Sequence, residues 1–288
     1  MPTSLLQLIL FALAAQASLR GDLESSAHIL DEYRSRSGGF EQVSFTNGNE
    51  RHDFNSWVLD LRARDACAVR IRYYPSIPVA SRNGYVLPRY HSDHRLGGRV
   101  DSLGRQIYTN ANPAPWGIEV TYPHGIEYWS PEWRLIEPRP ETGPVWSVTY
   151  AVADIVSRPA HVETADQAAK NLETSLRAIS QFDLEHGRGH WSGIAFQPAI
   201  DLLNGSNPSA PPGTLPPDLG VSPDRASLLL ASAAGWVFGG MGAWNDNGPP
   251  RPELSDEYEQ ITMSLYDAVS FGFVAGVNAG QPEICPTP

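Results

Sequence analysis

The segments Gly117-Ile-Glu-Val-Thr-Tyr, Ile126-Glu-Tyr-Trp and Pro144-Val-Trp-Ser-Val-Thr-Tyr decide the fold class of this 288-residue chain. Apolar and polar residues largely alternate along each segment, which is the period of two that a β-strand with one wetted face produces. Residues typical of turns, above all Pro and Gly, separate the segments. This region therefore predicts neighbouring short strands of an antiparallel sheet.

The same alternation extends toward the N-terminus, so we predict a β-rich region over residues 36–158. Turn residues again lie between the apolar runs, as in Thr46-Asn-Gly-Asn. The further predicted strands are Phe40-Glu-Gln-Val-Ser-Phe, Ser56-Trp-Val-Leu-Asp-Leu-Arg and Ala68-Val-Arg-Ile-Arg-Tyr-Tyr, with shorter ones at 84–87 and 106–109.

Residues 159–288 have a helical pattern instead. Apolar residues recur close to every 3.6 positions from Ala168 to Phe182, with charged residues opposite them. Further helices are predicted at 226–237 and from Ser255 onward, a helix or strand at 194–203, and a Pro-rich loop at 204–223. The sequence therefore predicts an α+β fold, an antiparallel sheet in the N-terminal half packed by C-terminal helices, in one compact domain.

The first 35 residues predict a helix whose role has two interpretations. Leu5 to Ala17 is apolar and ends in the small-x-small pattern Ala15-Gln-Ala17, as a signal peptide covering residues 1–17 would. Alternatively, Thr3 or Ser4 caps a helix that is retained, buried and continues through Tyr33. The segment is too short to span a bilayer alone. We expect a cytoplasmic protein, or a secreted or periplasmic one if residues 1–17 are cleaved.

The charge balance is acidic, which limits the classes of partner. Lys and Arg total 21 against 32 Asp and Glu, for a net charge of −11. A protein that binds duplex nucleic acid needs a basic surface, so nucleic acid is excluded as an expected partner. The same acidity disfavours an anionic membrane surface, and we expect no stable membrane insertion.

The two cysteines, Cys67 and Cys285, lie 218 positions apart and form no disulfide framework by themselves. They are able to pair, but a buried free thiol is the default expectation for Cys67. No Cys-x-x-Cys motif is present to bind zinc.

The segment Trp236-Val-Phe-Gly-Gly-Met-Gly-Ala-Trp-Asn-Asp-Asn-Gly lies between two predicted helices. Three glycines in four positions allow a sharp turn out of the first helix, and the aromatic residues supply apolar mass on both sides of it. No Lys or Ser/Thr follows as a phosphate-binding loop requires. The pattern is therefore typical of a structural turn between helices.

This turn, with Glu257-Tyr-Glu-Gln and Leu265-Tyr after it, resembles the C-terminal part of small uncharacterised bacterial proteins of immunity type. In those proteins a Gly-Met-Gly-small-Trp-Asn-Asp turn joins two helices. The resemblance implies a non-enzymatic protein that binds and occludes a toxin domain, with no catalytic residues and no cofactor. It implies that Trp244, Asn245 and Asp246 contact the partner.

An enzymatic alternative rests on two clusters of His and Asp residues, around residues 91–94 and 183–190. If the fold joins them, His and Asp side chains can bind a divalent metal such as zinc, and a metal-dependent hydrolase would follow. The sequence around Ser192 only loosely imitates a nucleophile elbow, because His190 and Ile194 stand where that turn needs glycine. The candidate metal ligands are His91, Asp93, His94, His186 and His190.

Overall fold

The computed structural model divides the chain into two compact units, described here one at a time. The first unit holds residues 1–6 and 161–279, and the second holds residues 7–160 and 280–288. The predicted α+β class is confirmed, with the sheet in the N-terminal half and long helices in the C-terminal half. That the units act as one domain stays a prediction. The structure describes residues 3–37, 41–73, 99–100, 106–107, 116–139, 143–153, 163–187, 189–205, 215–216, 218–238, 243–244, 248–282 and 285.

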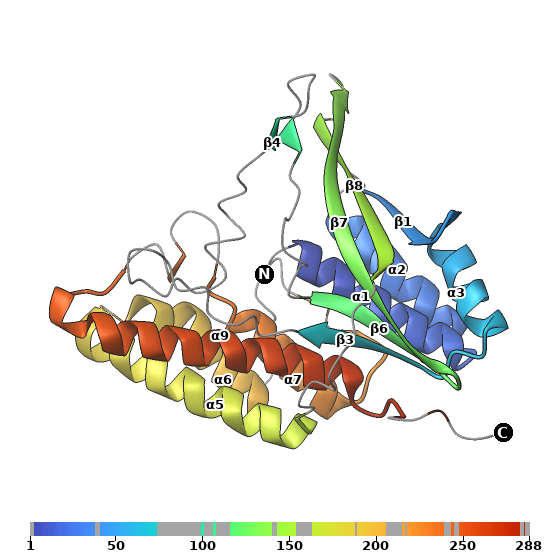
Figure 1. Ribbon diagram of the computed structural model, residues 1–288. Helices are drawn as coiled ribbons and strands as arrows, with labels where there is room; N and C mark the ends of the chain where they lie inside the picture. Colours follow the sequence, from blue (N-terminus) through green and yellow to red (C-terminus); the bar gives the residue numbers. More distant parts are fainter. Residues whose placement is uncertain are drawn as a thin grey trace. The chain divides into compact units, whose positions relative to one another are not determined.

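The second unit contains a six-stranded sheet in the order β2-β1-β8-β7-β6-β3 (Figure 1). Neighbouring strands are antiparallel except β1 and β8, which are parallel, so the sheet is mixed rather than purely antiparallel. The predicted strand at 84–87 lies outside the described residues. The strands are β1 (Glu41–Asn47), β2 (Glu50–His52), β3 (Ala68–Tyr73), β6 (Trp116–Tyr122), β7 (Gly125–Arg139) and β8 (Gly143–Ala153), with a separate pair β4 (Arg99–Val100) and β5 (Gln106–Ile107).

One face of this sheet carries a core of stacked aromatic rings. Phe45 of β1 stacks on Trp57 with 4.0 Å between ring centroids and on Tyr150 of β8 with 5.0 Å. Trp129 of β7 meets Trp57 edge to face at 5.6 Å. Phe11 of the N-terminal helix closes the cluster against Phe45 and Tyr150. All five side chains are buried, and together they join three strands to two helices.

The predicted strand at 56–62 is wrong, because this segment forms helix α3 (Phe54–Ala63). Asp53 caps the helix by accepting a hydrogen bond from the Ser56 backbone N–H at 2.8 Å. The buried residues are Trp57, Val58 and Leu61, whose spacing matches a helical turn. In a run of only seven residues, the apolar positions fit the period of a strand as well as that of a helix. The cap at Asp53 favours the helix.

The N-terminal region forms two helices, α1 (Thr3–Leu19) and α2 (Leu23–Ser37), rather than the single predicted one. The break falls at Gly21, whose φ of 86° lies in the left-handed region that ends helices. Two buried glutamines of α1 hydrogen-bond within the second unit. Gln7 contacts Tyr33 and Tyr150, and Gln16 donates to the Val69 backbone carbonyl at 2.8 Å.

These hydrogen bonds favour a retained helix over a cleaved signal peptide, although both interpretations stay predictions. Burial raises the pKa of Tyr150 well above its usual value, so its hydroxyl stays protonated and donates to Gln7 Oε1 at 2.9 Å. Loss of residues 1–17 would leave the Tyr33 and Tyr150 hydroxyls without this buried partner. No helix among the described residues is long and apolar enough to cross a membrane.

Cys67 and Cys285 form a disulfide, so the expectation of a free thiol at Cys67 is wrong. Their Cα atoms are 5.5 Å apart although 218 positions separate them in sequence. Closing so long a loop restricts the unfolded chain and in an entropic model stabilises the fold by roughly 5 kcal/mol. The sequence could not reveal the pair, because only the fold brings the C-terminal tail to β3.

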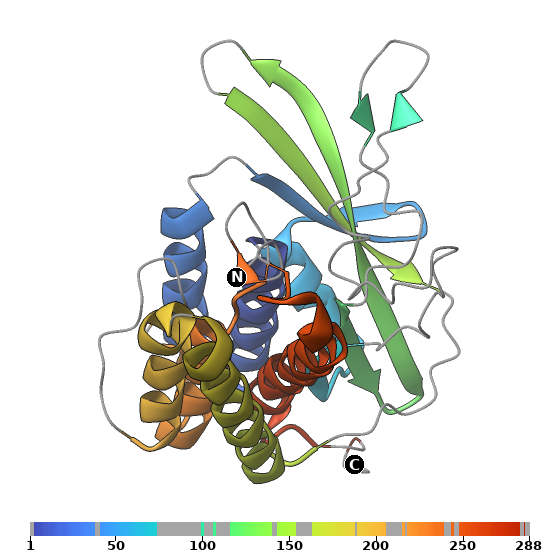
Figure 2. The same cartoon turned by 90° about the vertical axis from the view of Figure 1, so that its left-hand side faces the viewer.

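The first unit is built from helices that pack at close range (Figure 2). At Gly272 and Gly276 of the last helix, an added Cβ would meet Ser232 and Leu229 at 2.2 and 2.7 Å. Glycine therefore permits this helix to approach its neighbour closely. The elements are α5 (Ala165–Phe182), the π-helices η1 (Asp183–Gly187) and η2 (Ser192–Phe196), α6 (Gln197–Leu203), α7 (Pro223–Ala234), the short 3₁₀ helix η3 (Pro252–Leu254) and α9 (Ser255–Asn278).

Replacing Gln7 with alanine tests the buried bonds of α1. We expect the free energy of unfolding to fall by about 3 kcal/mol, because the Tyr33 and Tyr150 hydroxyls lose a buried partner and a cavity forms. Urea denaturation measures the change. Gln181→Ala is the matched control, since this exposed glutamine bonds only Glu185 in the described structure, and its cost should stay within about 0.5 kcal/mol. Equal effects of the two substitutions would contradict the structural role of α1.

Glu41 gives the second unit a predictable pH dependence. Burial raises the pKa of this carboxyl, against the opposing effect of hydrogen bonds from Tyr33 and Gln7. The folded protein therefore binds this proton more tightly than the unfolded chain, so stability falls as pH rises from about 4.5 through the raised pKa. Glu41→Gln does not titrate, and its stability relative to the native protein should increase over that interval. Urea midpoints at pH 4 to pH 8 measure this, and parallel profiles would refute it.

Candidate functional site

Helix α5 ends in an unusual corner formed by the two π-helices η1 and η2. π-Helical turns are rare and occur frequently at functional sites. The corner presents two large apolar side chains to solvent, Leu184 at 66% exposure and Ile194 at 53%. They are two of the five exposed large hydrophobic residues among those the structure describes. We refer to residues 183–196 as the π corner.

A buried carboxylate holds the π corner together from inside. Asp183 is buried and accepts a hydrogen bond from the Ser192 backbone N–H at 2.8 Å. The Ser192 hydroxyl donates to the Ser180 backbone carbonyl, also at 2.8 Å. These bonds join the end of α5 to the start of η2 across nine or more residues. Leu184 and Ile194 are therefore presented from a fixed backbone rather than from a loose loop.

Gly187 is required for this arrangement, because an added Cβ would lie 2.2 Å from Asp183 Oδ1. Gly189 has a φ of 68°, which a side chain rarely adopts. Gly193, by contrast, has no atom within 4 Å of the position of an added Cβ. The three glycines therefore differ in role although they lie within seven residues of one another.

Trp244 lies in an aromatic cluster that supports the π corner. Its ring stacks on Tyr258 at 5.1 Å and meets Phe182 and Phe196 edge to face at 6.4 and 5.7 Å. Its Nε1 donates to Thr262 Oγ1 at 2.8 Å, and the Tyr258 hydroxyl donates to its backbone carbonyl. Phe182 and Phe196 are the residues directly before η1 and at the end of η2, so Trp244 packs against both ends of the corner.

Trp244 is only 4% exposed, which limits the role that the sequence predicts for it. Direct contact of its ring with a partner stays a prediction, and the observed packing gives it a supporting role under the π corner. Asn245 and Asp246, the other predicted partner-binding residues, lie outside the described residues.

His186 lies on the π corner and contacts Arg251, the residue before η3. Its Nδ1 is 3.2 Å from Arg251 Nη2. A guanidinium only donates, so Nδ1 accepts and the imidazole proton is on Nε2. Glu185 Oε2 lies 3.8 Å from that Nε2. His190 is exposed, and its ring meets Trp191 edge to face at 5.6 Å.

The predicted metal ligands do not gather among the described residues. No three His, Cys, Asp or Glu side chains come together there in a way that could hold a metal ion. His91, Asp93 and His94 lie outside the described residues, so a site that includes them stays a prediction. The Ser192 hydroxyl is buried and bonded to the Ser180 carbonyl, which is not how a nucleophile is presented to a substrate.

Sequence reasoning singled out His186, His190 and Trp244, and the structure places all three in or against the π corner. It missed the exposure of Leu184 and Ile194, and it placed Asp183 in a candidate metal cluster rather than in the buried anchor of the corner. An exposed leucine and a buried aspartate look ordinary in the sequence, and the glycines at 187, 189 and 193 are the one signal that a tight corner occurs here. No protein-family model, curated protein or solved structure matches this chain at a significant level.

Gly187 and Gly193, two of the three glycines of the π corner, provide a matched test. Gly187→Ala forces a Cβ against the Asp183 carboxylate, so we expect a loss of about 1–3 kcal/mol in the free energy of unfolding. Gly193→Ala meets no neighbouring atom and should be neutral or stabilising by up to about 1 kcal/mol, since alanine favours helical backbone. Thermal and urea unfolding measure both variants. The Asp183 anchor would be disproved if Gly187→Ala were as stable as Gly193→Ala.

Proposed function

We propose that this protein is a non-enzymatic binding module that engages a protein partner through the π corner. The observation that carries the proposal is the exposure of Leu184 and Ile194 on a backbone fixed by Asp183. Exposed apolar side chains on a fixed backbone are typical of interface anchors, since little ordering entropy is lost when they are covered. Full burial of the two side chains would contribute about 3–5 kcal/mol before association costs.

The charge beside Leu184 and Ile194, together with the net charge of the chain, indicates the kind of partner. Glu185 is 54% exposed between Leu184 and His186, and the whole chain carries a net charge of −11. An acidic protein associates fastest with a basic surface, because the long-range field steers the encounter. A basic active site of a toxin has this chemistry. Occlusion of a bacterial toxin, which the resemblance of the C-terminal turn implies, is therefore the specific function that we propose.

The disulfide bears on where such a protein would work. Structural disulfides form and persist in oxidising compartments and are rare in the cytosol. The Cys67–Cys285 bond therefore supports an oxidising compartment. The buried hydrogen bonds of Gln7 and Gln16 oppose the cleavage of residues 1–17 on which the secreted or periplasmic alternative rests, so we propose toxin occlusion for either location.

The decisive experiment removes the two anchors without disturbing the fold. The Leu184→Ser/Ile194→Ser protein should keep the native unfolding temperature, because both side chains are exposed. Its affinity for the product of the neighbouring gene, which the proposed function predicts to be a toxin, should fall about 10- to 100-fold, as expected for the loss of central apolar contacts. Calorimetric titration measures the affinity, and survival of toxin-expressing cells measures protection.

Leu59→Ser is the matched control, because Leu59 is 62% exposed and belongs to the other unit. It should leave both affinity and protection unchanged. Full affinity in the double variant would show that the π corner is not the interface. Absence of any complex between the native protein and the neighbouring toxin would overturn the toxin assignment.

A further inference from the structure

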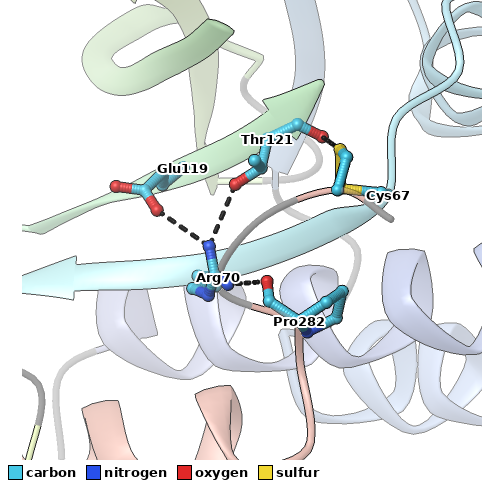
Figure 3. Close-up of a disulfide and its surroundings, with 6 residues drawn as sticks. Cys67, Arg70, Glu119, Thr121 and Pro282 are labelled. Carbon is cyan, nitrogen blue, oxygen red and sulfur yellow. Dashed lines mark hydrogen bonds and ion pairs between the residues drawn. A yellow bond between two sulfur atoms is a disulfide. The ribbon is translucent and has the colours of Figure 1, made fainter. Parts of the chain in front are cut away.

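The described residues of the C-terminal tail, 280–282 and 285, are held on the sheet of the second unit by a disulfide at Cys285 and a hydrogen bond from Arg70 to Pro282 (Figure 3). Cys285 is bonded to Cys67 at the start of β3, and its sulfur lies 3.7 Å from the Thr121 carbonyl of β6. Arg70 of β3 donates from Nη2 to the Pro282 backbone carbonyl. The tail therefore lies against β3, which is the last strand at one edge of the six-stranded sheet.

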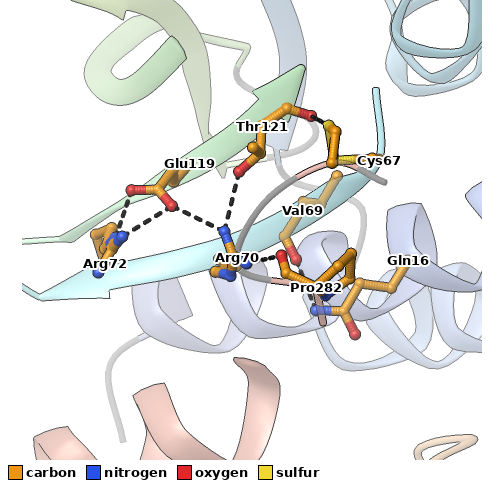
Figure 4. A network of polar contacts seen from close by, with 9 residues as sticks. Gln16, Cys67, Val69, Arg70, Arg72, Glu119, Thr121 and Pro282 are labelled. Atoms are coloured by element: carbon orange, nitrogen blue, oxygen red, sulfur yellow. Dashed lines mark hydrogen bonds and ion pairs between the residues drawn. A yellow bond between two sulfur atoms is a disulfide. The ribbon is translucent and has the colours of Figure 1, made fainter. Parts of the chain in front are cut away.

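Beneath this contact lies a buried cluster of three charges (Figure 4). Glu119 of β6 accepts hydrogen bonds from Arg70 at 3.2 Å and from Arg72 Nη2 at 2.9 Å. Arg70 also donates to Thr121 Oγ1 at 2.9 Å. All three charged side chains are more than nine-tenths buried, so two cations share a single carboxylate away from water.

The excess positive charge makes the tail energetically important to this cluster. A buried guanidinium must be matched by acceptors, because its transfer from water is costly. Arg72 Nη1 already has no acceptor in the described structure. The Pro282 carbonyl supplies an acceptor to Arg70 and so offsets part of that cost. Without the tail, this guanidinium donor of Arg70 would have to find water in place of the carbonyl.

We propose that the tail is a redox-controlled latch over this arginine–glutamate cluster. With the disulfide intact, Cys285 keeps Pro282 at Arg70, and the cluster stays covered. After reduction, the hydrogen bond from Arg70 to Pro282 is too weak by itself to hold the tail against its conformational entropy. The tail then leaves, and water reaches Arg70 and Arg72.

The chemistry of the switch is thiol–disulfide exchange. A dithiol reductant donates two electrons and two protons to the Cys67–Cys285 bond, which becomes two thiols while the reductant becomes a disulfide. Both cysteines are partly exposed, so a reductant can reach them without prior unfolding. Re-oxidation by a disulfide of the same class restores the latch, and the change is reversible.

Hydrogen exchange measured by mass spectrometry on the full chain tests the latch. On reduction with dithiothreitol, peptides that cover β3 and β6 should exchange about tenfold faster or more than they do in the oxidised protein, because hydration of the cluster between these strands loosens their pairing. Peptides from α5, in the other unit, should accelerate less, because they respond only to the lower stability of the whole fold that loss of the cross-link causes. Re-oxidation should return β3 and β6 to their original rates.

Cys285→Ser should show the fast exchange without reductant and should not respond to dithiothreitol. Unchanged exchange of β3 in the reduced native protein would overturn the latch. Acceleration of α5 equal to that of β3 would also overturn it, because reduction would then act only through the stability of the whole fold and not through the tail. If Cys285→Ser does not fold, the reduced and re-oxidised native protein still decides between these outcomes.

Discussion

The stacking of Phe45 between Trp57 and Tyr150 is the contact on which the second unit depends. It fixes which face of β1 and β8 points into the core, and side chains in a strand alternate strictly between faces. A shift of one residue would turn Phe45 outward and bring Ser44 into the aromatic cluster. Through the ladder of paired strands, the same register places Arg70 opposite Glu119 on the other face. The aromatic core and the buried charges are therefore two consequences of one register.

Much of the fold could be predicted because the signals are local. The alternation at 117–122 correctly predicts a strand, but the expected wetted face is wrong there, because Glu119 and Thr121 on the polar face are buried as well. The helical spacing from Ala168 to Phe182 reflects burial of one helix face. The prediction of a strand at 56–62 was wrong because a short apolar run fits both the period of a strand and the period of a helix. The N-terminal cap at Asp53 favours the helix. The parallel placement of β1 beside β8 and the Cys67–Cys285 pair join residues about 100 or more positions apart. No local pattern encodes such contacts.

The candidate site shows the same division between local and tertiary information. Its glycines were visible in the sequence, and His186, His190 and Trp244 stood out by residue type. The π corner is a candidate binding surface because Leu184 and Ile194 are exposed. Their exposure depends on which residues the fold places around them. Trp244 illustrates the converse, since an aromatic residue that suggests an interface is buried and bonded to Thr262. Residue types in the sequence identified the region of the π corner, and the burial or exposure of each side chain in the structure indicates its role there.

The buried charges raise the question of what such a cluster contributes. Apolar residues of similar volume often stabilise a protein as well as a buried ion pair or better, so Arg70, Arg72 and Glu119 are poorly explained by stability alone. What an apolar cluster cannot do is recognise one backbone carbonyl, because that requires a donor in a fixed place. Arg70 provides this donor to Pro282, and the disulfide beside it brings the carbonyl within reach. The cluster is therefore best understood as the part of the sheet that recognises the tail. Part of its cost is offset only while the tail is in position.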